Sequence, residues 1–257
     1  MDLQLHGKVA IVTGASRGIG RAIARTLADE GMSLTLVARS QDLLRELSQS
    51  LSVPTLVQAV DLREPETPQS IVEATLKRFG HLDLLVNNAG ATVRGDFLSL
   101  SDETWQDGFS LKFYGAMRCC RAAWSSLQAR KGSIVNIVGI GGRTGSSEFA
   151  IGGAVNAALL NLTKVLADRG IAEGIRVNAI NPGAILTDRL QTRIQKLADE
   201  RHMDSQAAEL ELARQMKIDR FGTPEEIGRV VAFLASPVAG YCQGMIVDVD
   251  GGQTRTL

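Results

Sequence analysis

The chain has 257 residues, of which 44% are hydrophobic and 22% charged. This is enough for one sizeable α/β core, and the length fits one domain over 1–257 better than two. The 28 basic and 28 acidic residues cancel to a formal net charge of zero, which argues against a nucleic acid or an acidic membrane as partner.

Short runs rich in valine, isoleucine and leucine alternate with longer amphipathic segments along the chain. The runs predict strands at 8–12, 33–37, 55–60, 82–86, 133–138, 176–180 and 245–249. The segments between them include helical patterns at 19–29, 67–78, 104–128 and 156–167. Continuous apolar strands alternating with helices predict a parallel sheet of seven strands, covered by helices on both faces.

The sequence also carries expectations about compartment. The first strand pattern starts near Lys8 with no apolar leader before it, and no run of eighteen or more apolar residues predicts a membrane span. Cys119, Cys120 and Cys242 do not form a disulfide framework and are expected to be buried thiols. We therefore expect a cytoplasmic protein.

A glycine-rich turn follows the first predicted strand, where residues 13–20 read TGASRGIG. Glycines at 14, 18 and 20 permit a tight turn and let the backbone approach a pyrophosphate at the N-terminus of the next helix. Because a strand precedes the turn and a helix follows it, the motif predicts a dinucleotide site in a doubly wound, Rossmann-type α/β fold.

This turn resembles the Thr-Gly-x-x-x-Gly-x-Gly motif of the short-chain dehydrogenase/reductase superfamily. The resemblance covers nearly the whole chain. Within the superfamily, the chain resembles the 3-oxoacyl-carrier-protein reductase-like members. Further landmarks stand in family order at 61–62 (DL), 87–90 (NNAG), 181–183 (NPG) with Thr187, 220–226 (RFGTPEE) and 249–252 (VDGG). The resemblance implies that Asp61 contacts the adenine, that 87–90 lies beside the cofactor and that Thr187 binds the nicotinamide carboxamide.

The second strand ends without a carboxylate, at Arg39, and Arg17 lies within the glycine turn. An NAD site uses an acidic side chain at this strand end, whereas a guanidinium suits the extra phosphate of NADP. The alternative is that both arginines are solvated surface residues. We expect NADP(H), bound by Gly14, Ser16, Arg17, Gly18, Ile19, Gly20, Arg39, Asp61, Leu62, Asn88, Ala89, Gly90, Pro182, Gly183 and Thr187.

The resemblance departs at the catalytic positions. Where the family has serine, tyrosine, lysine and asparagine, the aligned residues here are Gly139, Gly152, Asn156 and Lys112. The chain's tyrosines, Tyr114 and Tyr241, do not align with the family's tyrosine. Lys112 stands where the family has its asparagine, and Asn156 stands where the family has its lysine. One ammonium and one amide are thus kept on the same two helices in exchanged positions, so we take both as candidate catalytic residues. No Cys/His spacing indicates a metal.

Three interpretations remain open at this stage. The chain is an NADP(H)-dependent oxidoreductase that reduces an unidentified carbonyl with altered catalytic groups, a catalytically silent NADP(H)-binding sensor or partner subunit, or a structural homo-oligomer without cofactor. The first is favoured slightly, because of Lys112 and of a charged insertion.

That insertion spans 187–217, between the last two strands, and is expected to form a helical lid over one end of the sheet. Four of its cations could meet an acidic or acyl-carrier substrate, but its six carboxylates offset them, and a solvated lid is the favoured interpretation. The cations are Arg189, Arg193, Lys196 and Arg201.

The helices at 104–128 and after Asn156 resemble the family's dimer contact, which implies a homotetramer, or a homodimer if a second contact at the C-terminal strand is missing.

Overall fold

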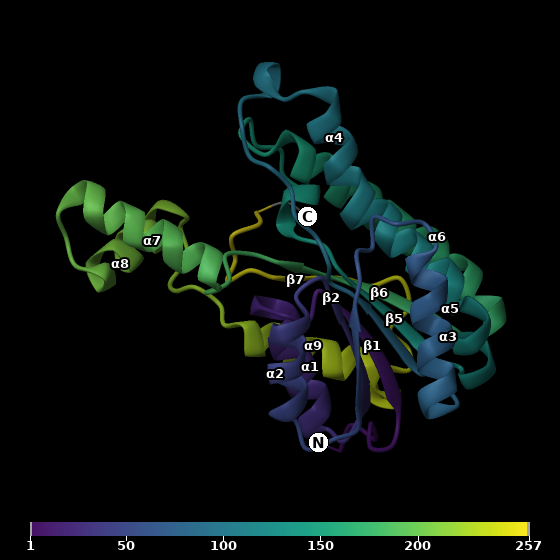
Figure 1. Cartoon of the computed structure of the whole chain (residues 1–257). Helices are drawn as coiled ribbons and strands as arrows, with labels where there is room; N and C mark the ends of the chain where they lie inside the picture. The colour runs from purple at the N-terminus through teal and green to yellow at the C-terminus, as the bar shows by residue number, and fades with distance from the viewer. Residues whose placement is uncertain (1, 256–257) are drawn as a thin grey trace.

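A computed structural model describes residues 2–255. Its core is one parallel sheet of seven strands in the order β3-β2-β1-β4-β5-β6-β7, seen edge-on in Figure 1. The strands are β1 (Val9–Thr13), β2 (Ser33–Ala38), β3 (Thr55–Ala59), β4 (Leu84–Asn87), β5 (Ser133–Ile137), β6 (Arg176–Pro182) and β7 (Ile246–Val249). The predicted doubly wound parallel sheet is confirmed.

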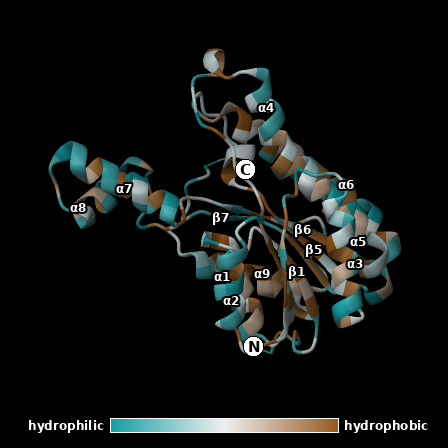
Figure 2. Cartoon of the chain, viewed as in Figure 1, coloured by the Kyte–Doolittle hydropathy of each residue, from teal (hydrophilic) through white to brown (hydrophobic). Residues whose placement is uncertain are grey.

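Helices cover both faces of the sheet. The helices α1 (Gly18–Asp29), α2 (Gln41–Gln49) and α9 (Pro224–Ala235) contribute to one apolar cluster, and α3 (Thr67–Phe79), α5 (Ala116–Arg130) and α6 (Ala150–Glu173) cover the other face. Strands β1, β4 and β5 are buried at every position, and this is why their sequences are mostly apolar and carry no charged residue. Figure 2 shows the hydrophobic strands enclosed by helices whose outer sides are hydrophilic.

A buried polar chain fixes α6 against the middle of the sheet. Asn87 Nδ2 donates to Asn136 Oδ1 (2.9 Å), and Asn136 Nδ2 donates to Thr163 Oγ1 on α6 (2.9 Å). Buried amides that pair with one another tolerate only one relative placement of the elements that carry them. The register of α6 over β4 and β5 is therefore well determined, which matters because α6 carries Gly152 and Asn156.

Two predicted helices have different bounds in the structure. The pattern at 104–128 is interrupted: α4 (Asp102–Phe109) and α5 are joined by a π-helical turn, η2 (Ser110–Gly115). The pattern at 156–167 belongs to a longer helix, because α6 begins at Ala150 and ends at Glu173. π-Helical turns occur frequently at functional sites, and this one carries Lys112.

Two arms extend from the carboxyl end of the sheet (Figure 1). One consists of α4 and the 3₁₀ turn η1 (Phe97–Ser99); the other consists of α7 (Asp188–Arg201) and α8 (Ser205–Gln215). The second arm corresponds to the predicted insertion and has an apolar cluster of its own, which includes Ile194, Leu212 and Phe221. It projects sideways from the sheet instead of lying over it. Short 3₁₀ turns complete the described chain at η3 (Ile140–Gly142) and η4 (Pro237–Ala239).

Helix α6 has the length and composition of a membrane span, with 24 residues that include an 18-residue stretch of mean hydropathy 1.4. Its apolar residues have another use here, because Val155, Leu159 and Ala167 are buried against the sheet and neighbouring helices. Val165 and Ile171 on the same helix are 57% and 70% exposed. The high hydropathy of α6 thus has two sources: residues buried in the core of the protein, and an apolar face that no described residue covers.

Candidate functional site

The glycine turn is held against the end of β4 by hydrogen bonds between two side chains, Asn88 and Thr13, and the backbone. Asn88 Nδ2 donates to the carbonyl oxygens of Thr13 (3.0 Å) and Gly14 (3.2 Å), and Thr13 Oγ1 accepts from the backbone N–H groups of Asn88 and Ala89. A Cβ atom on Gly20 would lie 2.2 Å from the Gly14 carbonyl oxygen. Only glycine fits there, and α1 starts directly behind the turn with its N-terminal N–H groups available to an anion.

A cleft of about 470 Å³ opens in front of this turn. Its wall is formed by the glycine turn, the ends of β4, β5 and β6, and the start of α7. Ten of the predicted cofactor residues line it: Gly14, Arg17, Gly18, Ile19, Gly20, Asn88, Ala89, Gly90, Pro182 and Thr187. Gly183 lines the adjoining cavity, whereas Ser16, Arg39, Asp61 and Leu62 line neither.

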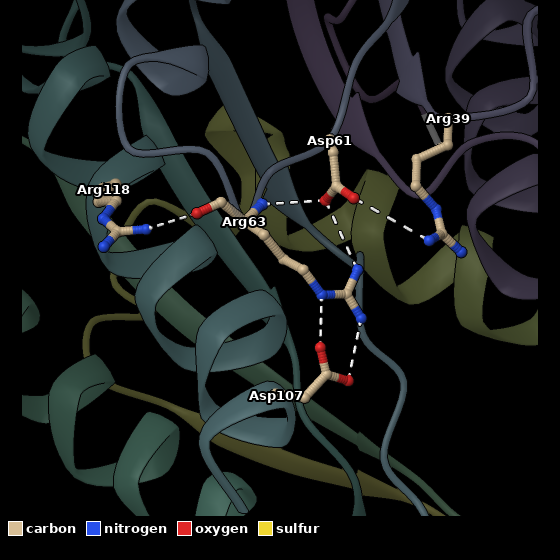
Figure 3. A network of polar contacts seen from close by, with 5 residues as sticks. All are labelled: Arg39, Asp61, Arg63, Asp107 and Arg118. Atoms are coloured by element: carbon tan, nitrogen blue, oxygen red, sulfur yellow. Dashed lines mark hydrogen bonds and ion pairs between the residues drawn. The ribbon is translucent and has the colours of Figure 1, made fainter. Parts of the chain in front are cut away.

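Arg39 and Asp61 face each other at the ends of β2 and β3 (Figure 3). Arg39 Nη1 lies 4.0 Å from Asp61 Oδ2, and the Arg39 side chain is 70% exposed. Arg17 is also open to solvent and lies 3.8 Å from Asp188. Exposed ion pairs at such distances contribute little free energy, so both guanidinium groups are available to a phosphate.

Arg63 joins this region to the arm that carries α4 (Figure 3). Its Nε and Nη2 donate to the two carboxylate oxygens of Asp107 on α4 (2.7 and 3.1 Å), while its Nη1 lies 3.5 Å from Asp61 Oδ1. Arg118 on α5 donates to the Arg63 carbonyl oxygen (3.1 Å). The loop after β3 is therefore tied to the elements on both sides of the π-helical turn.

Lys112 reaches from that turn into the bottom of the cleft. Its Nζ donates to the Val138 carbonyl oxygen at the end of β5 (2.5 Å), and its stem lies over Gly90, where a Cβ would be 2.8 Å from Lys112 Cδ. The stem is partly exposed along the cleft wall, but the ammonium is enclosed. Burial, with a smaller contribution from Arg189, lowers the pKa of Lys112 to about 8.

Gly139 and Asn156 line the second cavity next to Lys112. Gly139 has a φ of +131°, which disfavours any other residue, and its N–H donates to Asn181 Oδ1 (3.2 Å). Asn156 is 3% exposed; its Nδ2 lies 3.5 Å from the Gly139 carbonyl oxygen, and its Oδ1 has no partner among the described residues. A buried acceptor without a donor is unusual, and Asn156 lines the second cavity, beside Gly139.

The space beside Gly152 is filled by Phe149, a residue for which the sequence analysis predicted no role. A Cβ on Gly152 would lie 2.1 Å from Phe149 Cζ. The same ring carries the Arg94 guanidinium on its face, 4.4 Å from the ring centroid. Tyr114, by contrast, is 44% exposed and lines neither cavity, as its place two residues after Lys112 predicts.

A second cavity of about 460 Å³ adjoins the first beyond Lys112. It is bounded by Gly139, Asn156 and Phe149 on the sheet side and by the start of α7 on the other. Its charged lining residues, as the structure describes them, are Arg94, Lys112, Arg189 and Arg193, and it has no lining carboxylate. The sequence analysis named three of these cations and missed Arg94. The described residues contain no cluster of three or more His, Cys, Asp or Glu side chains suited to a metal.

Comparisons with known proteins agree with this architecture. A family model described as Enoyl-(Acyl carrier protein) reductase matches residues 14–254. The 3-oxoacyl-[acyl-carrier-protein] reductases FabG of Vibrio cholerae and Escherichia coli are each 34% identical over 251 residues, which is 97% of this chain and 98% of the relative.

Solved structures extend the likeness to the whole fold. L-sorbose reductase from Gluconobacter frateurii, complexed with NADPH and L-sorbose, superposes over 100% of both chains with a TM-score of 0.95 and 37% identity. YwfH, an NADPH-dependent reductase involved in bacilysin biosynthesis, covers 97% of this chain and 99% of its own, with a TM-score of 0.90 and 30% identity. The chain belongs to the short-chain dehydrogenase/reductase family.

Proposed function

We propose that this protein is an NADP(H)-dependent oxidoreductase that reduces a carbonyl substrate with catalytic groups different from those usual in its family. NADP(H) is the cofactor that accompanies the similar structures of L-sorbose reductase and YwfH. The single observation that carries the catalytic part is the enclosed ammonium of Lys112 at the junction of the two cavities.

The residues present fit this cofactor. Because Gly20 has no side chain, α1 can begin directly against the Gly14 carbonyl, where a Cβ would lie 2.2 Å away, and α1 presents free N–H groups to the pyrophosphate. Among the described residues, the strand end beside the adenosine ribose offers the guanidinium of Arg39 and no carboxylate closer than Asp61. Thr187, directly before α7, lines the cleft beside Gly18 and would bind the carboxamide.

The substitutions at four family positions support the proposal of altered chemistry. In the family a tyrosine protonates the forming alkoxide, a lysine lowers the pKa of that tyrosine and a serine orients the carbonyl. Gly152 offers no side chain for the first of these contacts and Gly139 none for the third, and the positive φ of Gly139 disfavours a serine. A positioned general acid contributes about 10²–10⁴ in rate, so another donor is needed.

Lys112 is the group that we assign to that task. Bound NADPH supplies the hydride. The alkoxide that forms on the substrate must receive a proton, and the Lys112 ammonium lines the cavity in which that oxygen would lie. A pKa of about 8 keeps the amine largely protonated at neutral pH while making it a stronger acid than an ordinary lysine. Asn156, with its unpartnered Oδ1, would orient the ribose or the substrate.

Single-turnover oxidation of bound NADPH with a panel of ketones tests the proposal. We expect turnover in the unaltered protein and a loss of about 10² or more in Lys112→Met, the lower range for a general acid. Lys164→Met is the matched control, since Lys164 also donates to a backbone carbonyl, that of Gly244, but lies outside both cavities. Unchanged turnover in Lys112→Met would remove Lys112 from the mechanism.

A catalytically silent NADP(H)-binding protein is the second candidate. It is favoured by the ring of Phe149, which lies over Gly152 and leaves no room there for a side chain. NADPH binding without turnover of any ketone in the panel would favour this function over the first. A failure to bind NADPH at all would point to the third interpretation, a structural oligomer.

We further propose that the protein is a cytoplasmic homotetramer whose contacts lie on α6 and around β7. Val165 and Ile171 on α6, and Val238, Tyr241 and Met245 before β7, are large apolar residues that are at least 42% exposed. Exposed apolar groups on α6 and beside β7 fit contacts with other subunits. Measurement of the molecular mass at micromolar concentration tests this, and a monomer would contradict it.

A further inference from the structure

The second cavity has an unbalanced positive charge. Four cationic side chains line it, from three separate parts of the chain: the loop after β4 (Arg94), the π-helical turn (Lys112) and the start of α7 (Arg189 and Arg193). A cavity with several cations and no lining carboxylate attracts anions into it. The loop residue Glu148 is the acidic side chain that acts on Arg94, and it is exposed outside the cavity lining.

The charges on α7 divide into two groups in the structure. Lys196 pairs with Glu200 at 3.7 Å, and Arg201 pairs with Glu211 of α8 at 3.8 Å, so these two cations are compensated within the arm. Arg189 and Arg193, one turn apart at the start of the same helix, make no ion pair with any described residue and line the cavity. Both arginines are exposed, as a solvated lid predicts, but they also line the cavity and have no carboxylate partner among the described residues.

Arg94 meets these two arginines from the other side of the cavity. Its guanidinium lies over the Phe149 ring at 4.4 Å, an arrangement that fixes a cation without neutralising it. Burial lowers the pKa of Arg94, as do Arg193 and Arg189, while Glu148 opposes them. Three guanidinium groups therefore converge on one volume and repel one another in the absence of an anion.

We propose that this cavity binds a carbonyl substrate that carries its own carboxylate, which Arg94 and Arg193 hold at the end away from Lys112. The inference rests on the proposed reductase function and names its substrate class. A guanidinium binds a carboxylate through two parallel hydrogen bonds, which orients the substrate as well as attracting it. Phe149, Leu190 and Met216 complete the lining with apolar surface, so a short hydrocarbon chain fits between the carboxylate and the carbonyl.

This recognition separates the chain from a relative that acts on a neutral sugar. A polyol would leave the guanidinium groups without a counter-charge, whereas a keto acid removes their mutual repulsion on binding. Arg189 lines both cavities and can also meet the pyrophosphate, so Arg94 and Arg193 are the residues that report on the substrate alone.

Calorimetric titration of the NADP⁺-loaded protein tests the proposal without requiring turnover. The probes are pyruvate, acetoacetate and levulinate, each beside its methyl ester. We expect at least one acid to bind about tenfold or more tightly than its ester, consistent with a charge-assisted pair. Arg94→Met and Arg193→Met should each remove most of that difference, and Lys196→Met, which alters an ion-paired cation on the same helix, should leave it intact.

The outcomes separate this inference from the proposed function. Equal affinity for every acid and its ester, or a preference for acids that survives in both arginine variants, would overturn the assignment of a carboxylate. Tighter binding of pantetheine phosphate than of all three acids, dependent on Arg94, would overturn it in favour of a phosphate-bearing substrate. Acid-selective binding with no NADPH oxidation would uphold the anion site while counting against Lys112 as a proton donor.

Discussion

The two halves of the cleft are built in different ways. The cofactor half consists mainly of backbone: glycines that permit close approach, a helix N-terminus, and carbonyl groups locked by the Asn88 amide. The substrate half consists of long side chains, Lys112, Phe149, Arg94 and Arg193, which come from a π-helical turn, two loops and an arm. The first half admits little change, whereas the charge and shape of the second half depend on individual side chains.

The two halves therefore differ in the substitutions that they tolerate. A backbone cradle depends on residues that lack side chains, so nearly every substitution in it causes a collision. A cavity formed by side-chain ends on separate elements can exchange its charge and shape one residue at a time, while the sheet beneath it remains fixed by contacts such as Asn87–Asn136–Thr163.

The largest effect is expected from Gly20→Ala in the backbone half. The new Cβ would lie 2.2 Å from the Gly14 carbonyl oxygen, and backbone cannot give way as a side-chain end can. We expect NADPH affinity to fall by about 10² or more, comparable to two lost hydrogen bonds to a charged group. Fluorescence titration measures this. Gly145→Ala, which meets nothing within 4 Å, is the control, and equal loss in both variants would contradict the steric argument.

A smaller effect is expected at the border of the cofactor half, from Arg39→Asp. The unaltered protein should bind NADPH at least about tenfold more tightly than NADH, since a charge-assisted hydrogen bond to the additional phosphate contributes more than 1.4 kcal/mol. The substitution replaces attraction with repulsion and should reverse the preference. Titration with both cofactors measures it, and equal affinities in the unaltered protein would remove Arg17 and Arg39 from the phosphate site.

In the substrate half, Lys112 should impose a pH dependence. The proton donor is the ammonium, and its pKa of about 8 means that the rate of carbonyl reduction should fall about tenfold per pH unit above pH 8. Single-turnover rates between pH 6 and pH 10 measure this decline, which Lys112→Met should lack. A rate that is flat through that range would exclude Lys112 as the acid.

The same pKa predicts a stability effect of defined sign. Lysine in the unfolded chain titrates near 10.5, so between about pH 8 and 10.5 the unfolded state binds more protons than the folded state. The free energy of unfolding should therefore rise with pH across this window through Lys112. Denaturant titrations of the unaltered protein and of Lys112→Met should differ in this slope, and identical slopes would contradict the lowered pKa.

The smallest effect is expected from Gly152→Ala. Alanine in a helix interior gains about 1 kcal/mol over glycine, but the Phe149 ring must swing away and lose its contact with Arg94, which is worth about 0.5–1 kcal/mol. These terms nearly cancel, so we expect the free energy of unfolding to change by less than about 1 kcal/mol. A loss above about 2 kcal/mol would show that the ring is held rigidly; Phe149→Leu in the same background should then restore stability.

The sequence predicted the backbone half well and the substrate half in part. Glycine spacing determines where a cradle can form, so Gly14, Gly18 and Gly20, which line the cleft, could be placed from the motif alone. Lys112 was located by its exchange with Asn156. Arg94 could not be placed, because it lies 99 positions from Arg193 and only the folded loop brings the two together. The contact of Phe149 with Gly152 could have been predicted from their spacing, because an aromatic residue three positions before a glycine in a helix can cover that glycine.

The bridge formed by Arg63 bears on the order in which ligands bind. It connects Asp61, to which we assign a contact with the adenosine, to Asp107 on α4, less than two turns before Lys112. A dinucleotide that engages Asp61 would hold the bridge, and with it the π-helical turn, in one arrangement before any substrate arrives. We therefore expect a compulsory sequence in steady-state kinetics, with the nucleotide entering first and leaving last, and a random sequence once Arg63 is replaced by methionine.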